Sequence, residues 1–314
     1  MASAEEGQAS GHEAGFCAEL SLGVGESEMG SLGDFDIGIF VEARKPFPRL
    51  ALQAIAPEFN ARVVKLWEEF GERGEGAHPR VLPVRLPVPA QADPLQVFCC
   101  LPLPKGEMLP VRLEIESYDE LMDLDLDRMR FDPSSYETYR DDTVRAVVCT
   151  HGKVDPCCAR RGNATLRALV ESPDVEVWHG AHFGGCRFAA NVWFLQSGNC
   201  YGRVLPEDAL SFARSEGRGE VARLGYRGRI GQTSLAAAAE QLLRERYDLW
   251  AMPEVVVREV SPTEPGRWKV EADVEGAERV LGLGIRQVSE QVRPLTCRSE
   301  ITGPPYGYEI LDRV

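Results

Sequence analysis

The chain has 314 residues, of which 44% are hydrophobic and 27% are charged, and its net charge is −14. This length allows two domains with a buried core, and the composition is ordinary for a globular protein. The acidic balance argues against nucleic acid or an anionic membrane surface as a partner, because both are bound through basic faces. No run of 18 or more apolar residues occurs, so we expect no membrane-spanning helix.

The N-terminal stretch, residues 1–14, is acidic, small and polar, and we expect it to be a disordered tail. It has neither the basic-then-apolar layout of a secretory signal nor the arginines of a transit peptide. The chain carries nine cysteines, an odd number that fits a reducing cytoplasm better than a disulfide scaffold. We therefore expect a cytoplasmic protein whose clustered cysteines form a metal or redox site.

Alternating apolar side chains predict a strand over residues 34–43, and apolar residues at helical spacing predict a helix over residues 57–72. Proline-rich turns then separate three strand-like runs, at residues 81–86, 95–101 and 109–115. A short helix over residues 118–129 and a linker over residues 131–142 complete the expected first half.

The second half begins with a buried-strand pattern that ends at Cys149, and a helix is expected from about residue 161. The next expected elements are a strand at 175–180, a hairpin at 191–205, a helix at 206–215, a loop at 226–232 and a helix capped by Thr233. Residues 254–285 are typical of a β-hairpin, and the tail from residue 293 is expected to be irregular. Both halves share a strand–helix–strand–strand–strand order, which suggests two related α/β units.

Cysteines concentrate around the loop that follows the first strand of the second half. Cys149 ends this strand, and Cys158 lies nine positions later. Asp155-Pro156 predicts a turn between them, so the loop can fold back and point two thiolates at one centre. Cys157 is adjacent and could compete with Cys158 for the same metal. The alternative is that these cysteines are buried thiols of the core, a common place for free cysteine.

A second pair of soft donors lies further along the chain. His182 and Cys186 are separated by three residues, of which Gly184 and Gly185 favour a loop or a helix start. Glycines also let backbone N–H groups approach an anionic centre closely. Arg187 adjoins the pair and could offset a negative charge there. The alternatives are that His182 is a core histidine with its hydrogen bonds satisfied by the protein, and that Cys186 is a small residue of the core.

Thiolates favour zinc or iron–sulfur clusters, and imidazole suits both. Zinc sites usually show short C-x2–4-C spacings, which neither pair has, so the spacing favours a [2Fe-2S] cluster with four ligands. His151 follows the first loop cysteine closely, and we expect it to donate a hydrogen bond to a thiolate. Cys297 has no predicted role. The remaining cysteines are expected in the core: Cys17, Cys99, Cys100 and Cys200.

The sequence closely resembles the sucrase/ferredoxin-like family in three segments, VCTHGKVDPCCARRG, HFGGCRFAANVWFLQSGNCYGRV and GYRGRIG. CAELSLGVGES near the N-terminus and RPLTC near the C-terminus resemble it too. The resemblance implies a thioredoxin-like ferredoxin domain with one [2Fe-2S] cluster, held by two cysteines of the first loop and two histidines spaced H-x3-H in the second. Cys149, Cys158 and His182 match these positions, whereas Cys186 stands where a histidine is usual.

The cysteine at position 186 changes the charge of the expected cluster. A thiolate in place of a neutral imidazole adds one negative charge, and negative charge disfavours the incoming electron. Two-His Rieske centres have potentials of about −150 to +300 mV, against roughly −400 mV for plant-type four-Cys sites. We therefore predict a one-His cluster with a potential below that of two-His relatives. Its potential should depend on pH at alkaline values, where His182 loses its second-nitrogen proton.

We expect four parts in this α/β chain: a tail (1–14), a smaller N-terminal α/β domain (15–140), a thioredoxin-like [2Fe-2S] ferredoxin domain (141–252) and a C-terminal β-hairpin extension (253–314). The predicted function is one-electron transfer, and we expect an electron carrier in preference to a stand-alone enzyme. Cys149 and Cys158 are expected on one iron, and His182 and Cys186 on the other. The His-bearing iron should lie nearer the solvent and take the electron.

A redox partner protein is implied, but the sequence identifies neither donor nor acceptor and leaves the oligomeric state open. Two other functions compete with electron transfer. The adjacent Cys157-Cys158 pair would permit a thiol–disulfide oxidoreductase, although the chain has no C-x-x-C motif at a helix N-terminus to lower a thiol pKa. The other alternative is a structural zinc protein, in which the metal only holds loops together.

Overall fold

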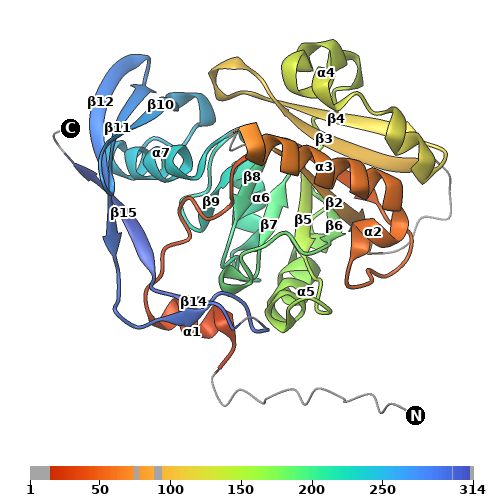
Figure 1. The fold of residues 1–314 in the computed structure, drawn as a ribbon, viewed down its shortest axis with the longest axis horizontal. Coiled ribbons are helices and arrows are strands. Elements are labelled where there is room, and N and C mark those ends of the chain that lie inside the picture. The colour runs from red at the N-terminus through yellow and green to blue at the C-terminus, as the bar shows by residue number, and fades with distance from the viewer. Residues whose placement is uncertain (1–14, 74–77, 88–93, 299, 312–314) are drawn as a thin grey trace.

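The computed structural model describes residues 15–73, 78–87, 94–298 and 300–311, and the tail predicted at residues 1–14 lies outside them. Its largest feature is a curled sheet of nine strands in the order β4-β3-β1-β2-β6-β5-β7-β8-β9 (Figure 1). Several helices pack around this sheet, which confirms the predicted α/β class. No helix of the described residues is long and apolar enough to cross a membrane.

The first half of the sheet consists of β1 (Phe35–Glu42), β2 (His78–Arg85), β3 (Leu95–Pro102) and β4 (Met108–Ile115). β1 pairs in parallel with β2 and antiparallel with β3, and β3 pairs antiparallel with β4. The sequence predicted all four strands to within a few residues. The almost continuous burial of β1 and β3 explains their long apolar runs, since strands covered on both faces have no solvent side.

The second half repeats this arrangement with β5 (Arg145–Cys149), β6 (Glu176–Gly180), β7 (Val192–Phe194) and β8 (Asn199–Tyr201). β5 pairs in parallel with β6 and antiparallel with β7, and β7 pairs antiparallel with β8. The two units therefore share strand order and direction, as the order of elements suggested. They join through β2 and β6, where Val84 pairs antiparallel with Gly180. One sheet crosses the boundary expected near residue 140, and the division into domains stays a prediction.

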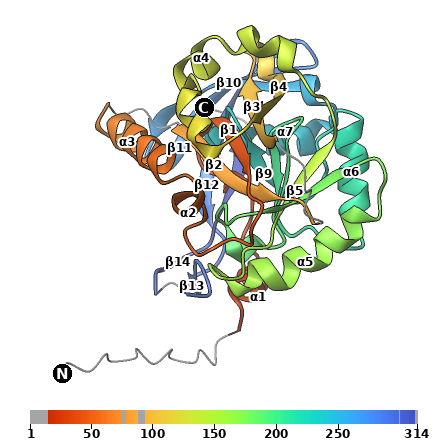
Figure 2. The same ribbon diagram turned by 90° about the vertical axis from the view of Figure 1, so that its right-hand side faces the viewer.

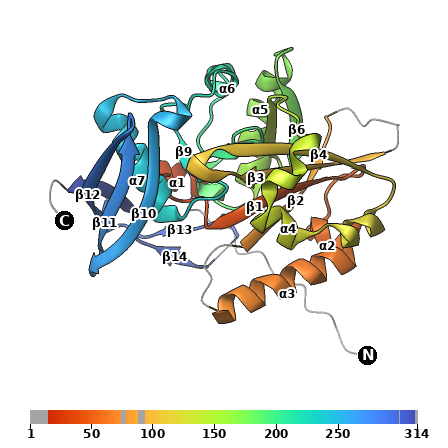
Figure 3. The same ribbon diagram turned by 90° about the horizontal axis from the view of Figure 1, so that it is seen from above.

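Each half of the curled sheet carries its own helices, and the two sets lie apart (Figures 2 and 3). α2 (Ala51–Ile55) and α3 (Pro57–Arg73) pack on the first half, and α5 (Pro156–Val170) and α6 (Ala209–Gly217) pack on the second. The helix predicted at residues 57–72 is α3, and it buries Phe59 and Val63 against Ile37 and Ile39 of β1. The helix predicted at residues 206–215 begins three positions later, as α6.

Residues 226–232, which were expected to form a loop, contain the edge strand β9 (Tyr226–Arg229). β9 pairs antiparallel with β8, with Asn199 opposite Arg229. The prediction was wrong because the glycine-rich motif suggests a turn, whereas the strand forms against a partner supplied by the fold. Gly228 has a positive φ of 131° within this strand, a conformation that glycine adopts without strain.

The segment between the two units is more ordered than predicted. The single helix expected over residues 118–129 is two short helices, η2 (Tyr118–Asp123) and α4 (Leu126–Phe131). They are separate because Asp125 caps α4, its side chain accepting a hydrogen bond from the backbone N–H of Arg128. The expected linker contains a 3-10 helix, η3 (Pro133–Tyr139), that packs on β4.

A second sheet packs on α7 (Ser234–Tyr247), which Thr233 caps as predicted. Its antiparallel strands are β10 (Val255–Glu264), β11 (Arg267–Val274), β12 (Ala277–Gln287) and β15 (Tyr306–Leu311). The hairpin predicted at residues 254–285 is confirmed as β10 to β12, but the expectation of an irregular tail was wrong, because the chain returns to add β15 beside β12. A pairing between segments that far apart leaves no local pattern in the sequence.

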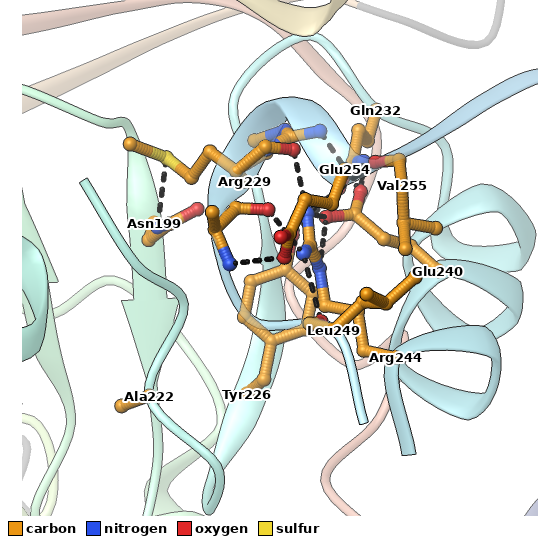
Figure 4. A network of polar contacts seen from close by, with 12 residues as sticks. Asn199, Ala222, Tyr226, Arg229, Gln232, Glu240, Arg244, Leu249, Glu254 and Val255 are labelled. Atoms are coloured by element: carbon orange, nitrogen blue, oxygen red, sulfur yellow. Dashed lines mark hydrogen bonds and ion pairs between the residues drawn. The ribbon is translucent and has the colours of Figure 1, made fainter. Parts of the chain in front are cut away.

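A buried ionic network joins α7 to its surroundings (Figure 4). Glu240 accepts hydrogen bonds from Arg244 of the same helix and from Arg229 of β9, at 2.7 and 2.9 Å. Arg244 also donates to the backbone carbonyls of Ala251 and Met252, at 2.8 Å each. The network therefore fixes α7 against the edge of the large sheet and against the segment that leads into β10.

The segment that precedes β1 and the segment that precedes β15 meet beside the start of α5. α1 (Cys17–Gly23) lies next to a small pair of strands, β13 (Arg293–Pro294) and β14 (Thr302–Gly303) (Figure 1). Glu26 is buried between them, and its carboxylate accepts hydrogen bonds from Arg293 and Arg187, at 2.7 and 2.8 Å. This ion-paired carboxylate helps to hold α1 and β13 against the loop at residues 182–187.

Candidate metal centre

The first loop of the candidate site is fixed by the start of α5. Asp155 is the N-cap, and its carboxylate accepts a hydrogen bond of 2.8 Å from the backbone N–H of Cys157. Pro156 occupies the first helical position, where its missing N–H costs nothing. The helix expected from residue 161 therefore begins at residue 156, and Cys157 and Cys158 lie in its first turn instead of in a loop.

α5 lies directly against the end of β5. A Cβ atom at Gly162 of the helix would overlap the backbone carbonyl of Cys149, so only glycine allows this close approach. The contact brings the first turn of α5 over the last residue of the strand. It thereby sets the thiols of Cys149 and Cys158 side by side, and both are fully buried.

The second loop follows β6 and depends on two glycines. Gly184 and Gly185 have φ values of 87° and 68°, in the left-handed region that favours glycine. A Cβ atom at Gly185 would overlap the guanidinium of Arg227. The chain then enters the short turn η4 (Cys186–Phe188), which directs the Cys186 thiol inward. The loop expected at these glycines is confirmed.

The structure brings all four predicted ligand residues together. The Sγ atoms of Cys158 and Cys186 each lie 3.7 Å from Nδ1 of His182. The donor atoms of Cys149, Cys158 and His182 all lie within 4.8 Å of one another. The three thiols are fully buried, whereas the imidazole is partly exposed. The donors of Cys149, Cys158 and His182 could together hold a metal ion, and Cys186 lies beside His182.

The four donors shift one another's pKa values. Hydrogen bonds from Cys158 and His182 hold the pKa of the Cys149 thiol well below its usual value, despite burial. Burial by itself would lower the pKa of His182, but the neighbouring Cys149 and Cys186 raise it to about 10. The imidazole is therefore protonated beside thiolate charge at neutral pH. A metal that binds here must displace that proton, so its affinity will rise with pH.

His151 supports this group in a different way from the one predicted. Its backbone N–H donates to the Cys149 sulfur, while its ring Nδ1 accepts a hydrogen bond of 3.2 Å from the backbone N–H of His182. The expected hydrogen bond to a thiolate thus comes from the main chain, and the side chain joins the two loops. The ring Nε2 is buried without a hydrogen-bond partner among the described residues.

Three residues that the prediction missed hold the glycine loop. Arg227 donates to the carbonyl of Gly184, at 3.4 Å, and to the side-chain oxygen of Asn191, at 2.9 Å. Asn191 in turn donates to the carbonyl of Gly185, at 2.9 Å. Arg80 donates to the carbonyl of His182, at 3.4 Å. Arg227 and Asn191 had a sequence signal, because they lie in the GYRGRIG and HFGGCRFAANVWFLQSGNCYGRV segments, whereas Arg80 had none.

Two of the nearby cations place positive charge beside the thiols. Burial lowers the pKa of Arg80 to about 10, so the guanidinium stays charged at neutral pH beside Cys149. Arg187 lies near Cys186, as expected, and the pKa of its guanidinium is lowered by burial. Its charge is shared with Glu26, to which it donates a hydrogen bond of 2.8 Å.

Cys157 does not compete for this group. Its Sγ lies 3.6 Å from Sγ of Cys17 and 3.3 Å from Sγ of Cys297, so it belongs to a different set of thiols. Cys99, Cys100 and Cys200 are buried in the core, as predicted. Cys17 is buried too, but it faces these other thiols.

A cavity of about 400 Å³ opens beside the imidazole of His182. Its lining includes His151 and Arg80 from the site and apolar side chains from the segment around α2, such as Leu50 and Leu52. The partly exposed edge of His182 is thus reached from the surface, whereas the three thiols lie behind it.

A family model described as sucrase/ferredoxin-like matches residues 53–228, more than half of the chain. The chain belongs to the sucrase/ferredoxin-like family. Neither the curated proteins nor the solved structures contain a match. The part that is shared with the sucrase/ferredoxin-like family begins within α2 and ends within β9. It includes Cys149, Cys158, His182 and Cys186, but it excludes β1, Cys17 and Cys297.

Proposed function

We propose that this sucrase/ferredoxin-like protein transfers single electrons through one [2Fe-2S] cluster held by Cys149, Cys158, His182 and Cys186. The observation that carries the proposal is the convergence of these three thiols and one imidazole from two loops. The donor set suits the group, because iron–sulfur clusters take thiolate ligands and accept imidazole in their place. When bound, the cluster supplies one-electron chemistry that no side chain of the site can provide.

The strand arrangement supports a thioredoxin-like ferredoxin domain around the site. β5 and β6 are parallel and joined by α5, and β7 and β8 follow as an antiparallel pair on the other side of β5. Both ligand loops start where β5 and β6 end, so parallel strands bring them to the same edge of the sheet. The first unit, with the same topology, would shield this edge and add the residues around α2.

The chain's own residues would orient and insulate the cluster. Cys149 and Cys158 would hold one iron from inside the core, and His182 and Cys186 would hold the other. Arg80 places a positive charge beside the thiolates, which favours the reduced state. The partial exposure of His182 supports the expectation that electrons enter and leave on its side. A redox partner protein of unknown identity would dock over the cavity beside that imidazole.

A single zinc ion is the second candidate, and one distance favours it. Ligands at zinc–sulfur and zinc–nitrogen bond lengths in a tetrahedron lie about 3.6 Å apart. Sγ of Cys158 and Nδ1 of His182, which would bind different irons of a cluster, are 3.7 Å apart. The thiol–disulfide oxidoreductase is disfavoured, because the thiols of the group are fully buried and a partner disulfide must reach an exposed thiolate.

Metal and sulfide analysis of the full-length protein, purified without oxygen, separates these functions. We expect a red-brown protein with two irons and two acid-labile sulfides per chain, whose visible absorption bleaches on reduction. Cys158→Ser should remove the iron and the colour, whereas Cys99→Ala, at a buried cysteine of the first unit, should retain both. If the protein contains no iron or sulfide, and Cys158→Ser removes a zinc ion that the wild type binds, the electron-transfer proposal is wrong and the site is a structural zinc site.

A further inference from the structure

Three cysteine thiols converge at a second place, outside the group already described. Cys17 is the first residue of α1, Cys157 lies in the first turn of α5, and Cys297 belongs to the segment between β13 and β14. The distances between their Sγ atoms are 3.6 Å for Cys17–Cys157, 3.3 Å for Cys157–Cys297 and 3.4 Å for Cys17–Cys297. These distances are far longer than a disulfide bond of about 2.05 Å.

A carboxylate completes this second group. Asp155 is fully buried, and one of its oxygens lies 3.9 Å from Sγ of Cys17 and accepts a hydrogen bond of 2.8 Å from the backbone N–H of Cys297. Its other oxygen caps α5. All four donor atoms lie within 4.8 Å of one another. In the part of the chain that the structure describes, no arginine or lysine forms an ion pair with Asp155.

A buried carboxylate beside three thiols calls for a positive charge, because an unpaired buried charge is costly. An ion at the centre of the group would supply it and would bind all four donors at once. Around one tetrahedral zinc ion the sulfur atoms lie about 3.8 Å apart, close to the 3.3–3.6 Å observed here. A polynuclear cluster would spread the same sulfurs over several metals and hold them farther apart.

We propose that Cys17, Cys157, Cys297 and Asp155 form a second, mononuclear metal site that binds zinc. The hard carboxylate oxygen favours Zn²⁺ over Cu⁺, which prefers soft ligands alone. The adjacent cysteines of α5 serve two different sites, since successive residues of a helix point about 100° apart. Cys158 faces His182, and Cys157 faces Cys17.

The site would fasten α1 and the segment around Cys297 to the helix that carries the first group. α1 has seven residues and β13 and β14 have two each, and the ion would tie these short elements to the first turn of α5. This role is separate from the electron-transfer proposal, because it uses none of the four residues proposed to hold the cluster. Cys17 and Cys297 also lie outside the region that matches the family.

Metal content of three full-length proteins tests the second site: the wild-type chain, Cys297→Ser and Cys99→Ala. We expect one zinc per chain in the wild type and in Cys99→Ala. Cys297→Ser should lose that zinc and keep its first-site metal content, its far-UV circular dichroism and any visible absorption of the wild type. Cys297 is only partly buried, so the serine variant should fold.

Two outcomes would overturn the site. The first is a zinc content that contradicts the site: either the wild-type protein has no stoichiometric zinc, or Cys297→Ser contains as much zinc as the wild type. The other is a disulfide among the three cysteines, which mass spectrometry after alkylation under denaturing conditions would reveal. If the first site also binds zinc, Cys158→Ser and Cys297→Ser should each remove one of two ions. If Cys297→Ser fails to fold, Cys17→Ser is measured instead, and zinc retained in that folded variant contradicts the proposal.

Discussion

Cys186 is the residue in which this chain differs from the histidine expected for its family, and its thiol is fully buried beside His182. If the group holds a [2Fe-2S] cluster, Cys186→His removes one negative charge from its surroundings. The reduced state is then less disfavoured, and we expect the midpoint potential to rise by roughly 100 mV or more. A spectroscopic redox titration of the variant and of Cys99→Ala provides the measurement. A lower potential in Cys186→His would contradict the charge argument.

Gly185, which has no side chain, helps to set the positions of the donor atoms of His182 and Cys186. Gly185→Ala would place a methyl group against the Arg227 guanidinium in addition to the cost of a left-handed backbone, about 1–2 kcal/mol. We expect the loop to shift and the metal content of the first group to fall.

Gly184→Ala is the matched control for this variant. Gly184 also has a positive φ, but a Cβ atom there meets nothing within 4 Å. The Gly184→Ala variant should therefore lose a similar amount of stability through its backbone conformation, and it should keep its metal. Equal metal loss in both alanine variants would show that backbone strain, and not the contact with Arg227, accounts for the effect.

At the scale of single elements, α6 carries a carboxylate that links stability to pH. Glu216 is buried, and Ser197, Asn199 and Tyr201 donate hydrogen bonds to it. Burial outweighs these bonds and raises the pKa of Glu216 from 4.5 to about 7. A carboxyl whose pKa is raised by folding stabilises the protein fully below its unfolded pKa, and this contribution is lost as the pH rises through the folded value.

We therefore expect wild-type stability, relative to Glu216→Gln, to fall between pH 4.5 and pH 7 by on the order of 3 kcal/mol. Urea unfolding of both proteins at several pH values measures the difference, and any constant offset from altered hydrogen bonds cancels. A difference that is independent of pH would show that Glu216 stays ionised throughout.

The network on α7 makes a second prediction at this scale. Arg244→Met leaves Glu240 buried with one cation fewer and frees carbonyls that Arg244 now satisfies (Figure 4). Breaking a buried ion pair in this way should lower the free energy of unfolding by about 3–5 kcal/mol. Because the penalty comes from the uncompensated charge, Arg244→Met combined with Glu240→Leu should cost less than the sum of the single variants. Additive costs in urea unfolding would contradict that explanation.

The elements show what the sequence can and cannot predict. The strands β1 to β8 and the helices α3 and α7 have strong apolar periodicity and a cap or turn at their ends, so local patterns sufficed. The start of α5 was misplaced because Asp155-Pro156 is compatible with a turn and with a capped helix, and only packing against Cys149 decides between them. β9 and β15 form against distant partners, and nothing local marks them.

At the scale of the whole molecule, the same division applies to the two groups of donors. Cys149, Cys158, His182 and Cys186 lie within one α/β unit, so the order of strands and loops could predict that they meet. Cys17 and Cys297 are 280 residues apart, and their meeting depends on how α1 and the β13–β14 segment both reach the start of α5. That route is set by the Glu26–Arg293 pair and by the small β13–β14 sheet, which show no periodicity.

The continuous sheet predicts that the two units unfold together. One core contains side chains of both units, and Phe98 of β3 packs edge-on against Trp178 of β6 with ring centroids 5.1 Å apart. Phe98→Leu should lower the free energy of unfolding by about 1–2 kcal/mol. We expect hydrogen exchange, followed by mass spectrometry, to accelerate equally in peptides from β1 and from β7.

Phe59→Leu is the control that separates cooperative from independent unfolding, because Phe59 packs only in the core of the first unit. If the β2–β6 junction couples the units, this distant change should accelerate exchange in β7 as much as in β1. If the units open independently, Phe59→Leu will leave β7 unchanged while β1 exchanges faster. That result would support the boundary expected near residue 140 and would make the junction a docking contact between two domains.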